Sequence, residues 1–179
     1  KEDYYRIRSE QPTEDLVRAA RVIYLTTLSF NGIYRLNSKG QFNVPYGHKV
    51  HLNPCNEENI MAVSKALRNA NILCADFEEV VENAQKGDLI YFDPPYTIIQ
   101  GNGFVKYNSN VFTWNDQIRL AQTAKRLKLR GCHVIISNAD VPEINELYYD
   151  FKSIRLERHS VIAASGKHRR KITENIFYS

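Results

Sequence analysis

With 179 residues, the chain is long enough for one well-buried core and a small additional lobe, and too short for two full domains. A hydrophobic content of 43% and a charged content of 25% are close to globular averages, which excludes a disordered chain, and no apolar run reaches membrane-spanning length. The net charge of +4 permits a polyanionic partner without requiring one. Because Lys1 opens a charged stretch that does not resemble a signal peptide, we expect a cytoplasmic protein.

The first predicted helix lies in QPTEDLVRAARVIYLTTLSFNG, residues 11–32. Thr13 is a suitable N-cap, and an Asn-Gly pair ends the segment. Leu16, Ala20 and Ile23 recur on one face, which we expect to point inward.

A β-hairpin is predicted next, in GIYRLNSKGQFNVPYGHK, residues 32–49, with NSKG as its turn. The segment carries several positive charges and contains few residues suited to a core. We therefore expect contacts from outside the hairpin to hold it in place.

A second helix is predicted over residues 57–70, with Ile60, Val63 and Leu67 inward. Beyond it, β-rich runs alternate with helical segments, which is the pattern of a doubly wound α/β sheet. The predicted strands are residues 71–77, 88–95, 133–140, 152–160 and 175–179, and the predicted helices are residues 113–131, from a Thr113 cap to a Gly131 stop, and 142–149.

Polar and aromatic residues follow three of these strands. They are Asp76 with Phe77, Asp93 to Tyr96, and Ser137 with Asn138 and Asp140. Because ligands of doubly wound sheets bind beyond the carboxyl ends of the strands, a site lined by acids and aromatic rings is predicted there.

The string Asp93-Pro94-Pro95-Tyr96 has three interpretations: a turn after a buried strand, a metal-binding or acid–base carboxylate, or a rigid cradle for a flat ring bearing an amine. The two prolines stiffen the loop and donate no backbone hydrogen, so acceptors are concentrated there. Neighbouring acids lack the spacing of a metal cluster and the three cysteines are widely separated, so we expect no metal.

An exocyclic amine on a purine or pyrimidine would suit such a cradle. The Asp93 carboxylate and the Pro94 carbonyl can accept its two hydrogens and favour a pyramidal nitrogen whose lone pair faces an electrophile. Tyr96 can stack on the ring. This arrangement suits attack on a methyl sulfonium.

The DPPY string and the segment FNGIYRLNSKGQFNVPYG together resemble the Dam-type, D12 class family of DNA N6-adenine methyltransferases. The likeness continues through ADF, GFVKYNSNVFTWNDQIRLA, VIISNAD and RRKITENIFYS. It implies a Rossmann-like class I methyltransferase sheet, incomplete as given, with a small recognition lobe built from a helix and a hairpin. Residues 1–55 would form the lobe, and residues 56–179 the C-terminal part of the catalytic domain.

The resemblance also implies roles for individual residues. Asp93, Pro94, Pro95 and Tyr96 would hold an adenine flipped out of duplex DNA, and S-adenosylmethionine would be the methyl donor, with Asp93 beside it. Asp76 and Phe77 would lie against the adenosine of this cofactor. Residues expected to contact DNA are Phe30, Asn31, Ile33, Arg35, Asn37, Lys39, Lys167, Arg169 and Arg170.

Among the DNA-contacting positions, Arg35 can pair bidentately with guanine, and Phe30 and Ile33 can enter a base step. Each could instead be a hairpin core residue. The loop GKHRRK, residues 166–171, would contact phosphates or be a solvated basic loop. GATC is the expected recognition site, and the expected cellular setting is a bacterial or phage cytoplasm in association with the nucleoid.

The family's F-x-G-x-G cofactor motif is absent from these residues. We therefore expect an upstream segment or a second polypeptide to supply it, and expect the 179 residues alone to be inactive. A restriction endonuclease of the same system would be a further partner, and no membrane is involved.

Two alternatives remain open from the sequence. One is methylation of a cytosine N4 or an RNA amine, and the other is a DNA-binding fragment without catalysis. The hairpin favours duplex DNA, and Asp as the first residue of DPPY favours adenine or cytosine.

Overall fold

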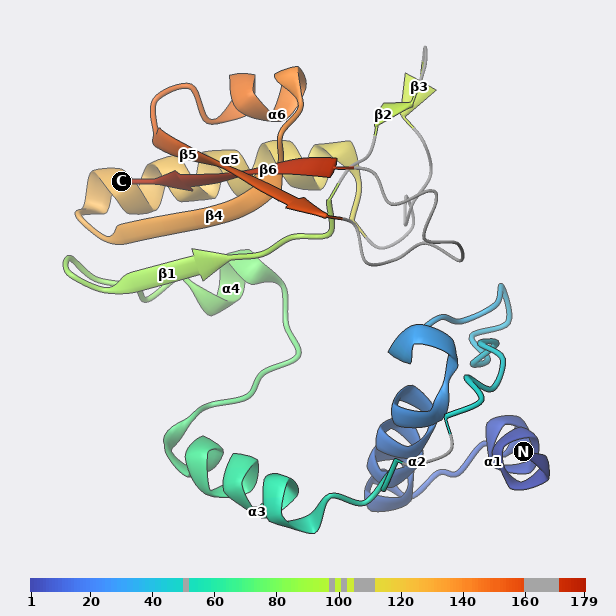
Figure 1. The fold of residues 1–179 in the computed structure, drawn as a ribbon. Helices are drawn as coiled ribbons and strands as arrows, with labels where there is room; N and C mark the ends of the chain where they lie inside the picture. The colour runs from blue at the N-terminus through green and yellow to red at the C-terminus, as the bar shows by residue number, and fades with distance from the viewer. Residues whose placement is uncertain (50–51, 97–98, 101–102, 105–111, 160–170) are drawn as a thin grey trace. The chain divides into compact units, whose positions relative to one another are not determined.

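The computed structural model describes residues 1–49, 52–96, 99–100, 103–104, 112–159 and 171–179. Internal contacts divide the chain into two compact units, Lys1–Ile72 and Leu73–Ser179 (Figure 1). The expected division at residue 55 is one of function, between the recognition lobe and the catalytic part, and it stays a prediction. No described helix has both the length and the apolar character needed to span a bilayer.

The first unit is built from helices and an irregular hairpin. Its elements are α1 (Glu2–Ser9), α2 (Asp15–Leu28), the 3-10 turns η1 (Phe30–Gly32) and η2 (Leu67–Asn69), and α3 (Glu57–Ala66). Both predicted helices are confirmed. The N-cap of α2 is Glu14, not Thr13, and it makes no side-chain capping bond.

The predicted hairpin is present without continuous strands. Two isolated antiparallel bridges, Ser29 with Tyr46 and Leu36 with Phe42, bring its arms together. The Tyr4 hydroxyl on α1 donates a hydrogen bond of 3.0 Å to the Val44 carbonyl, so the hairpin is held from outside, as expected. The core of this unit is small and consists of Tyr4, Leu25, Leu28, Phe42 and Val44.

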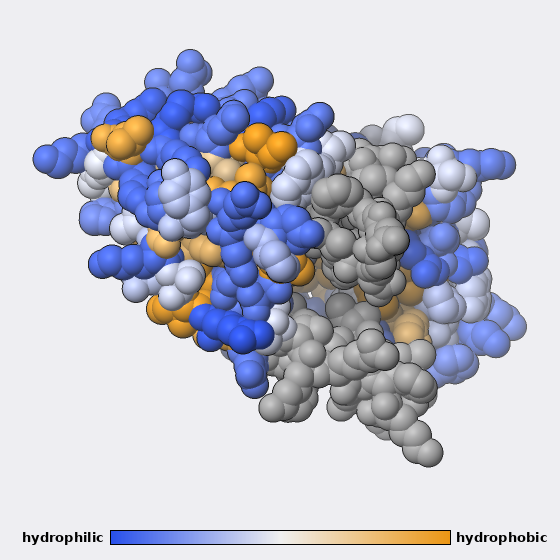
Figure 2. All heavy atoms as spheres, turned by 90° about the horizontal axis from the view of Figure 1, so that it is seen from above, coloured by the Kyte–Doolittle hydropathy of each residue, from blue (hydrophilic) through white to orange (hydrophobic). Residues whose placement is uncertain are grey.

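The predicted inward faces of α2 and α3 are wrong. Leu16 is 75% exposed and Ile23 is 41% exposed, while Ile60 is also exposed and α3 contains no buried residue. The helix α2 packs through Leu25 and Leu28, near its C-terminal end, because the first unit is too small to cover every apolar side chain of its helices. Figure 2 shows apolar side chains scattered in small patches over a largely polar face of the protein.

The second unit is a mixed sheet with helices packed on it. Its strand order is β1-β4-β6-β5; β1 and β4 are parallel, whereas β6 runs antiparallel to both its neighbours. The strands are β1 (Leu89–Phe92), β4 (His133–Ala139), β5 (Lys152–His159) and β6 (Lys171–Tyr178), with a separate pair β2 (Ile99–Gln100) and β3 (Gly103–Phe104), and the helices are α4 (Phe77–Val80), α5 (Trp114–Arg130) and α6 (Pro142–Leu147). The predicted α/β class is confirmed.

The longest helix, α5, has the ends that the sequence predicts. The Asp116 amide donates to the Thr113 hydroxyl at 3.2 Å and the Thr113 amide donates to the Asp116 carboxylate at 2.7 Å, which completes a capping box. Gly131 ends the helix at φ +89°, a conformation that L side chains rarely adopt. The helix packs on the sheet through Leu120, Ala124 and Leu127.

Residues 71–77 form no strand, contrary to the prediction. Ile72 and Leu73 are 75% and 67% exposed, and Asp76 caps α4 through the Glu78 amide. A strand requires a neighbour for its backbone hydrogen bonds, and no described strand pairs with the outer side of β1. In β1 itself the side chains alternate between exposed and buried, and Leu89 and Tyr91 lie on the exposed face.

Candidate active site

The parallel strands β1 and β4 bring two of the three predicted strand ends together. Phe92 is in register with Ile136, so the chain leaves both strands at the same edge of the sheet. There the Tyr96 hydroxyl and the Ser137 hydroxyl form a hydrogen bond of 2.5 Å. The predicted meeting of DPPY with the Ser137–Asp140 segment is thus observed.

Within DPPY, the Asp93 side chain is exposed, Pro94 is buried and Tyr96 is half-buried. Burial raises the pKa of the Tyr96 phenol, which the Ser137 hydrogen bond partly offsets, and the nearby carboxylates of Glu174 and Asp93 raise it further. Tyr96 is therefore a neutral ring at physiological pH, held at its hydroxyl end and suitable for stacking.

The loop is also held from behind by Gln117, which is fully buried on α5. Its Nε2 donates to the Pro95 carbonyl at 3.2 Å, and its Oε1 accepts from the Asn138 side chain at 3.0 Å. Gln117 is a site residue that the sequence patterns above do not predict. The available signal was a polar residue one turn inside a helix that follows DPPY, on its apolar face.

Asp76 and Phe77, the expected cofactor contacts, adjoin α5 at Arg119. The guanidinium donates to both carboxylate oxygens of Asp76, at 2.9 and 2.7 Å, and these hydrogen bonds hold the pKa of Asp76 below its ordinary value. The Phe77 ring lies 6.4 Å from the Phe92 ring and 4.7 Å from the Arg119 guanidinium carbon. Phe77 therefore packs next to the residue that precedes Asp93.

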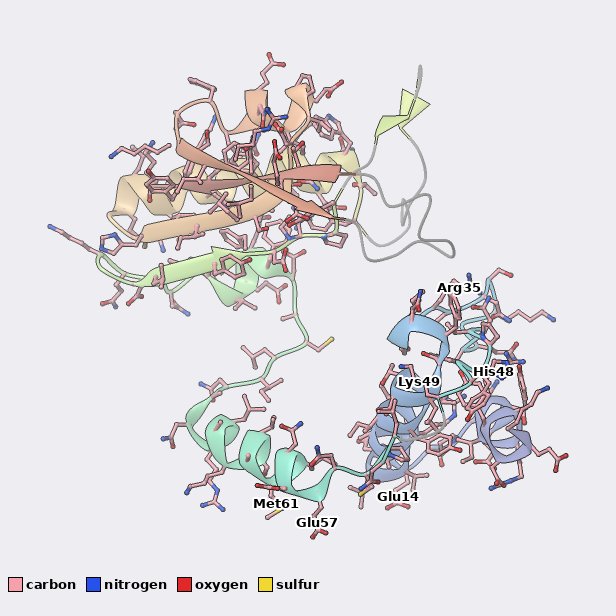
Figure 3. All side chains as sticks on the ribbon, in the orientation of Figure 1. Glu14, Arg35, His48, Lys49, Glu57 and Met61 are labelled. Carbon is pink, nitrogen blue, oxygen red and sulfur yellow. The ribbon has the colours of Figure 1, made fainter. Side chains whose placement is uncertain are left out.

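The expected DNA contacts in the first unit differ in their environments. Phe30 is 40% exposed, and Asn31 has φ +53° in the turn that follows α2. Ile33 is partly buried against the core. Arg35 is exposed, and its Nε donates to the Asn43 side chain at 2.7 Å (Figure 3). The first three thus lie in one short turn, with Arg35 two residues beyond it.

Asn37 has a structural role in the hairpin turn. Its Oδ1 accepts from the amides of Lys39 and Gln41, at 3.0 and 2.9 Å, and its Nδ2 donates to the Gln41 side chain. The Lys39 side chain is exposed at the same turn. Lys167, Arg169 and Arg170 lie outside the described residues.

Comparison with known proteins decides the family. Residues 1–162 match the family described as D12 class N6 adenine-specific DNA methyltransferase. The chain belongs to this family. It is 39% identical over 185 residues to the Type II methyltransferase M1.LlaDCHI of Lactococcus lactis subsp. cremoris, a match that covers 98% of this chain and 65% of the relative.

Two further relatives agree with this assignment. The Type II methyltransferase M.MjaIII of Methanocaldococcus jannaschii is 36% identical, and the match covers 95% of this chain and 61% of the relative. The DNA adenine methylase of Haemophilus influenzae is 35% identical, and the match covers 97% of this chain and 62% of the relative. The chain thus spans less than two thirds of the length of these curated relatives.

Proposed function

We propose that the complete polypeptide to which this chain belongs transfers a methyl group from S-adenosylmethionine to N6 of the adenine in GATC, after that adenine is flipped out of duplex DNA. The observation that carries the proposal is the exposed Asp93 carboxylate at the end of β1, beside a Tyr96 ring held by Ser137. An exposed carboxylate next to a fixed aromatic ring can bind a planar amine, through hydrogen bonds at the amine and stacking on the ring.

The chemistry follows from the acceptors of the loop. An adenine amine is a weak nucleophile because its lone pair is delocalised into the ring. Hydrogen bonds from the amine to the Asp93 carboxylate and the Pro94 carbonyl favour a pyramidal nitrogen, and the carboxylate stabilises the positive charge that develops there during transfer. Pro95 stiffens the loop so that this geometry exists before the base arrives.

The residues of the site suit S-adenosylmethionine, which supplies a methyl group on a positively charged sulfur when bound. The exposed Asp93 carboxylate provides a negative charge for that sulfonium, and the half-buried Phe77 ring, beside Phe92, provides an apolar surface for the adenine of the cofactor. The Asp76 carboxylate is paired with Arg119, so a contact from Asp76 to the cofactor would use its remaining acceptor capacity.

The reading of DNA bases is assigned to the first unit. Arg35 is held by Asn43 through Nε at 2.7 Å and Nη2 at 3.4 Å, so its remaining donors can face the guanine of GATC. Lys39 and the basic residues Lys167, Arg169 and Arg170 would contact phosphates. The exposed Phe30 and the adjoining Asn31 and Ile33 would fill the space that the flipped base leaves.

The proposed setting is the bacterial or phage cytoplasm, in association with the nucleoid. Two relatives are named Type II methyltransferases, which supports a restriction–modification role with an endonuclease partner.

One experiment tests substrate, base and site together. The complete polypeptide is incubated with S-adenosylmethionine labelled in its methyl group and with short duplexes that contain GATC, GTTC or GATG. Label recovered as N6-methyladenine from the GATC duplex alone supports the proposal. Label on cytosine would mean that cytosine is the target in place of adenine, and binding of the duplex without transfer would mean that the protein is a DNA-binding module.

A further inference from the structure

We infer that two buried amides, Gln117 and Asn138, are positioning residues for methyl transfer, because together they fix the direction of the DPPY loop. Neither side chain reaches the exposed face of Asp93 in any described contact. Both are 0% exposed, one on α5 and the other on β4. The inference rests on the proposed function, since it names what holds that same site in place.

The hydrogen bonds of the two amides allow only one orientation of each side chain. The Pro95 carbonyl can only accept, so Gln117 must turn Nε2 towards it, at 3.2 Å. Oε1 of Gln117 then faces Asn138, which must present its Nδ2, at 3.0 Å. Oδ1 of Asn138 is left to accept from the Ala139 amide, at 2.8 Å. The chain of bonds thus runs without ambiguity from the backbone of β4 to the loop.

This chain has a mechanical consequence for the loop. Pro95 is joined to Pro94, whose φ is restricted by its ring, so fixing the Pro95 carbonyl limits the directions in which the Pro94 carbonyl and the Asp93 carboxylate can point. The Tyr96–Ser137 hydrogen bond holds the other end of the string. The two anchors, at the Pro95 carbonyl and the Tyr96 hydroxyl, therefore fix the C-terminal half of the string, and the stiff pair of prolines carries that position to the acceptors that would meet the adenine amine.

Neither amide titrates, so the anchor is independent of pH across the physiological range. Its loss would displace the acceptors without removing any group that contacts substrate. Displacement of reacting groups by about 1 Å lowers rates by roughly 100-fold. The expected result is a loss of kcat with little change in the KM for DNA or cofactor.

Two substitutions in the complete polypeptide test the inference. Gln117→Met has a similar length and removes the hydrogen bonds with Pro95 and Asn138. Asn138→Leu has a similar shape and removes the donor that faces Gln117, so Oε1 of Gln117 is no longer held in place. We expect both variants to lower kcat by about 10- to 100-fold, with KM values for a GATC duplex and S-adenosylmethionine within about twofold of wild type.

The matched control is Asn145→Ala. Asn145, on α6, belongs to a different group of amide hydrogen bonds, with Asp140 and Asn175, and does not contact the loop. This variant should lower the melting temperature comparably while kcat stays unchanged. The inference is overturned if both test variants fold and keep the wild-type kcat, or if the control loses kcat to the same extent.

A second readout separates this inference from the proposed function. If the wild-type protein methylates no adenine, the proposed function fails, and NMR of 13C-labelled tyrosine rings still decides the inference. A single sharp Tyr96 signal in wild type that becomes broadened or doubled in both variants supports it. An unchanged signal overturns it.

Discussion

The two units of this chain differ in how firmly packing and hydrogen bonds hold their polar groups. In the second unit, the Asp93–Tyr96 string follows a strand whose partner β4 is fully buried at Val134, Ile136 and Asn138, and further bonds tie the string to α5. In the first unit, the hairpin rests on two isolated bridges and a core of five side chains. The proposed chemistry, which needs precise geometry, thus lies on the unit with the larger core, and the proposed reading of DNA lies on the less regular one.

The largest expected effect concerns the second unit. Asp93→Ala should lower the rate of methyl transfer by roughly 10²- to 10³-fold, because the carboxylate that accepts from the amine is removed. DNA binding should change little, since the residues proposed to contact DNA outside the flipped base are unchanged. Single-turnover transfer of labelled methyl, together with a fluorescence-anisotropy titration of a GATC duplex, measures both quantities. Persistence of wild-type transfer would contradict the assignment of Asp93.

The next prediction compares two leucines of the same helix in the first unit. Leu25 is 0% exposed, so Leu25→Ala should lower the free energy of unfolding by about 2–5 kcal/mol. Leu16 is 75% exposed, so Leu16→Ala should stay within about 0.5 kcal/mol. Denaturant unfolding of the two variants gives the comparison. Equal losses would mean that Leu16 is covered in solution.

These two leucines also show why the sequence predicted the second unit better than the first. In the second unit, β1, β4 and α5 occur where apolar runs, the Thr113 cap and Gly131 indicate. Periodicity marks which side chains share a face, but it cannot tell whether anything covers that face. The expected burial of Leu16 and Ile60 and the expected strand at residues 71–77 failed for this reason: each depends on a neighbour beyond its own segment.

At the site, the sequence predicted which segments meet but not how they are joined. DPPY and the Ser137–Asp140 segment were expected at one edge of the sheet, and the Tyr96–Ser137 bond links them. The Gln117 anchor was missed because a buried glutamine is recognisable only once α5 is packed behind Pro95. Long-range polar pairs of this kind leave no local pattern in the sequence.

A smaller effect is expected from Arg35 in the recognition unit. Arg35→Ala should reduce discrimination between GATC and a duplex with the guanine replaced by about 1–3 kcal/mol, because a bidentate base contact is lost. Lys39→Ala is the matched control at the same turn; it should weaken binding to both duplexes alike. Competition titrations at fixed salt measure the ratio. An unchanged ratio for Arg35→Ala would assign base reading to another residue.

The smallest expected effect is a pH dependence in the second unit. Hydrogen bonds from Asn145 and Thr173, together with the Arg155 guanidinium, hold the pKa of Asp140 below its ordinary value. A lowered pKa in the folded state stabilises the protein above the ordinary aspartate pKa, and this contribution is lost as the pH falls through the folded value. Asp140→Asn should therefore lower the melting temperature at pH 7 by about 2–4 °C and reduce its further decline on acidification.

Calorimetric scans between pH 7 and pH 2 test this last prediction. Asp15→Asn is a suitable control, because the contact of Asp15 in the described part of the chain is an exposed ion pair with Arg18. A wild-type pH profile in the Asp140→Asn variant would contradict the stabilising role of Asp140.

The most direct test of the central claim is a crystal structure of the complete polypeptide with a GATC duplex and a non-transferring analogue of S-adenosylmethionine. We predict that the target adenine leaves the duplex, stacks on Tyr96 and places its N6 within hydrogen-bonding distance of both the Asp93 carboxylate and the Pro94 carbonyl. An adenine that stays in the duplex, or an N6 held by other residues, would contradict the account.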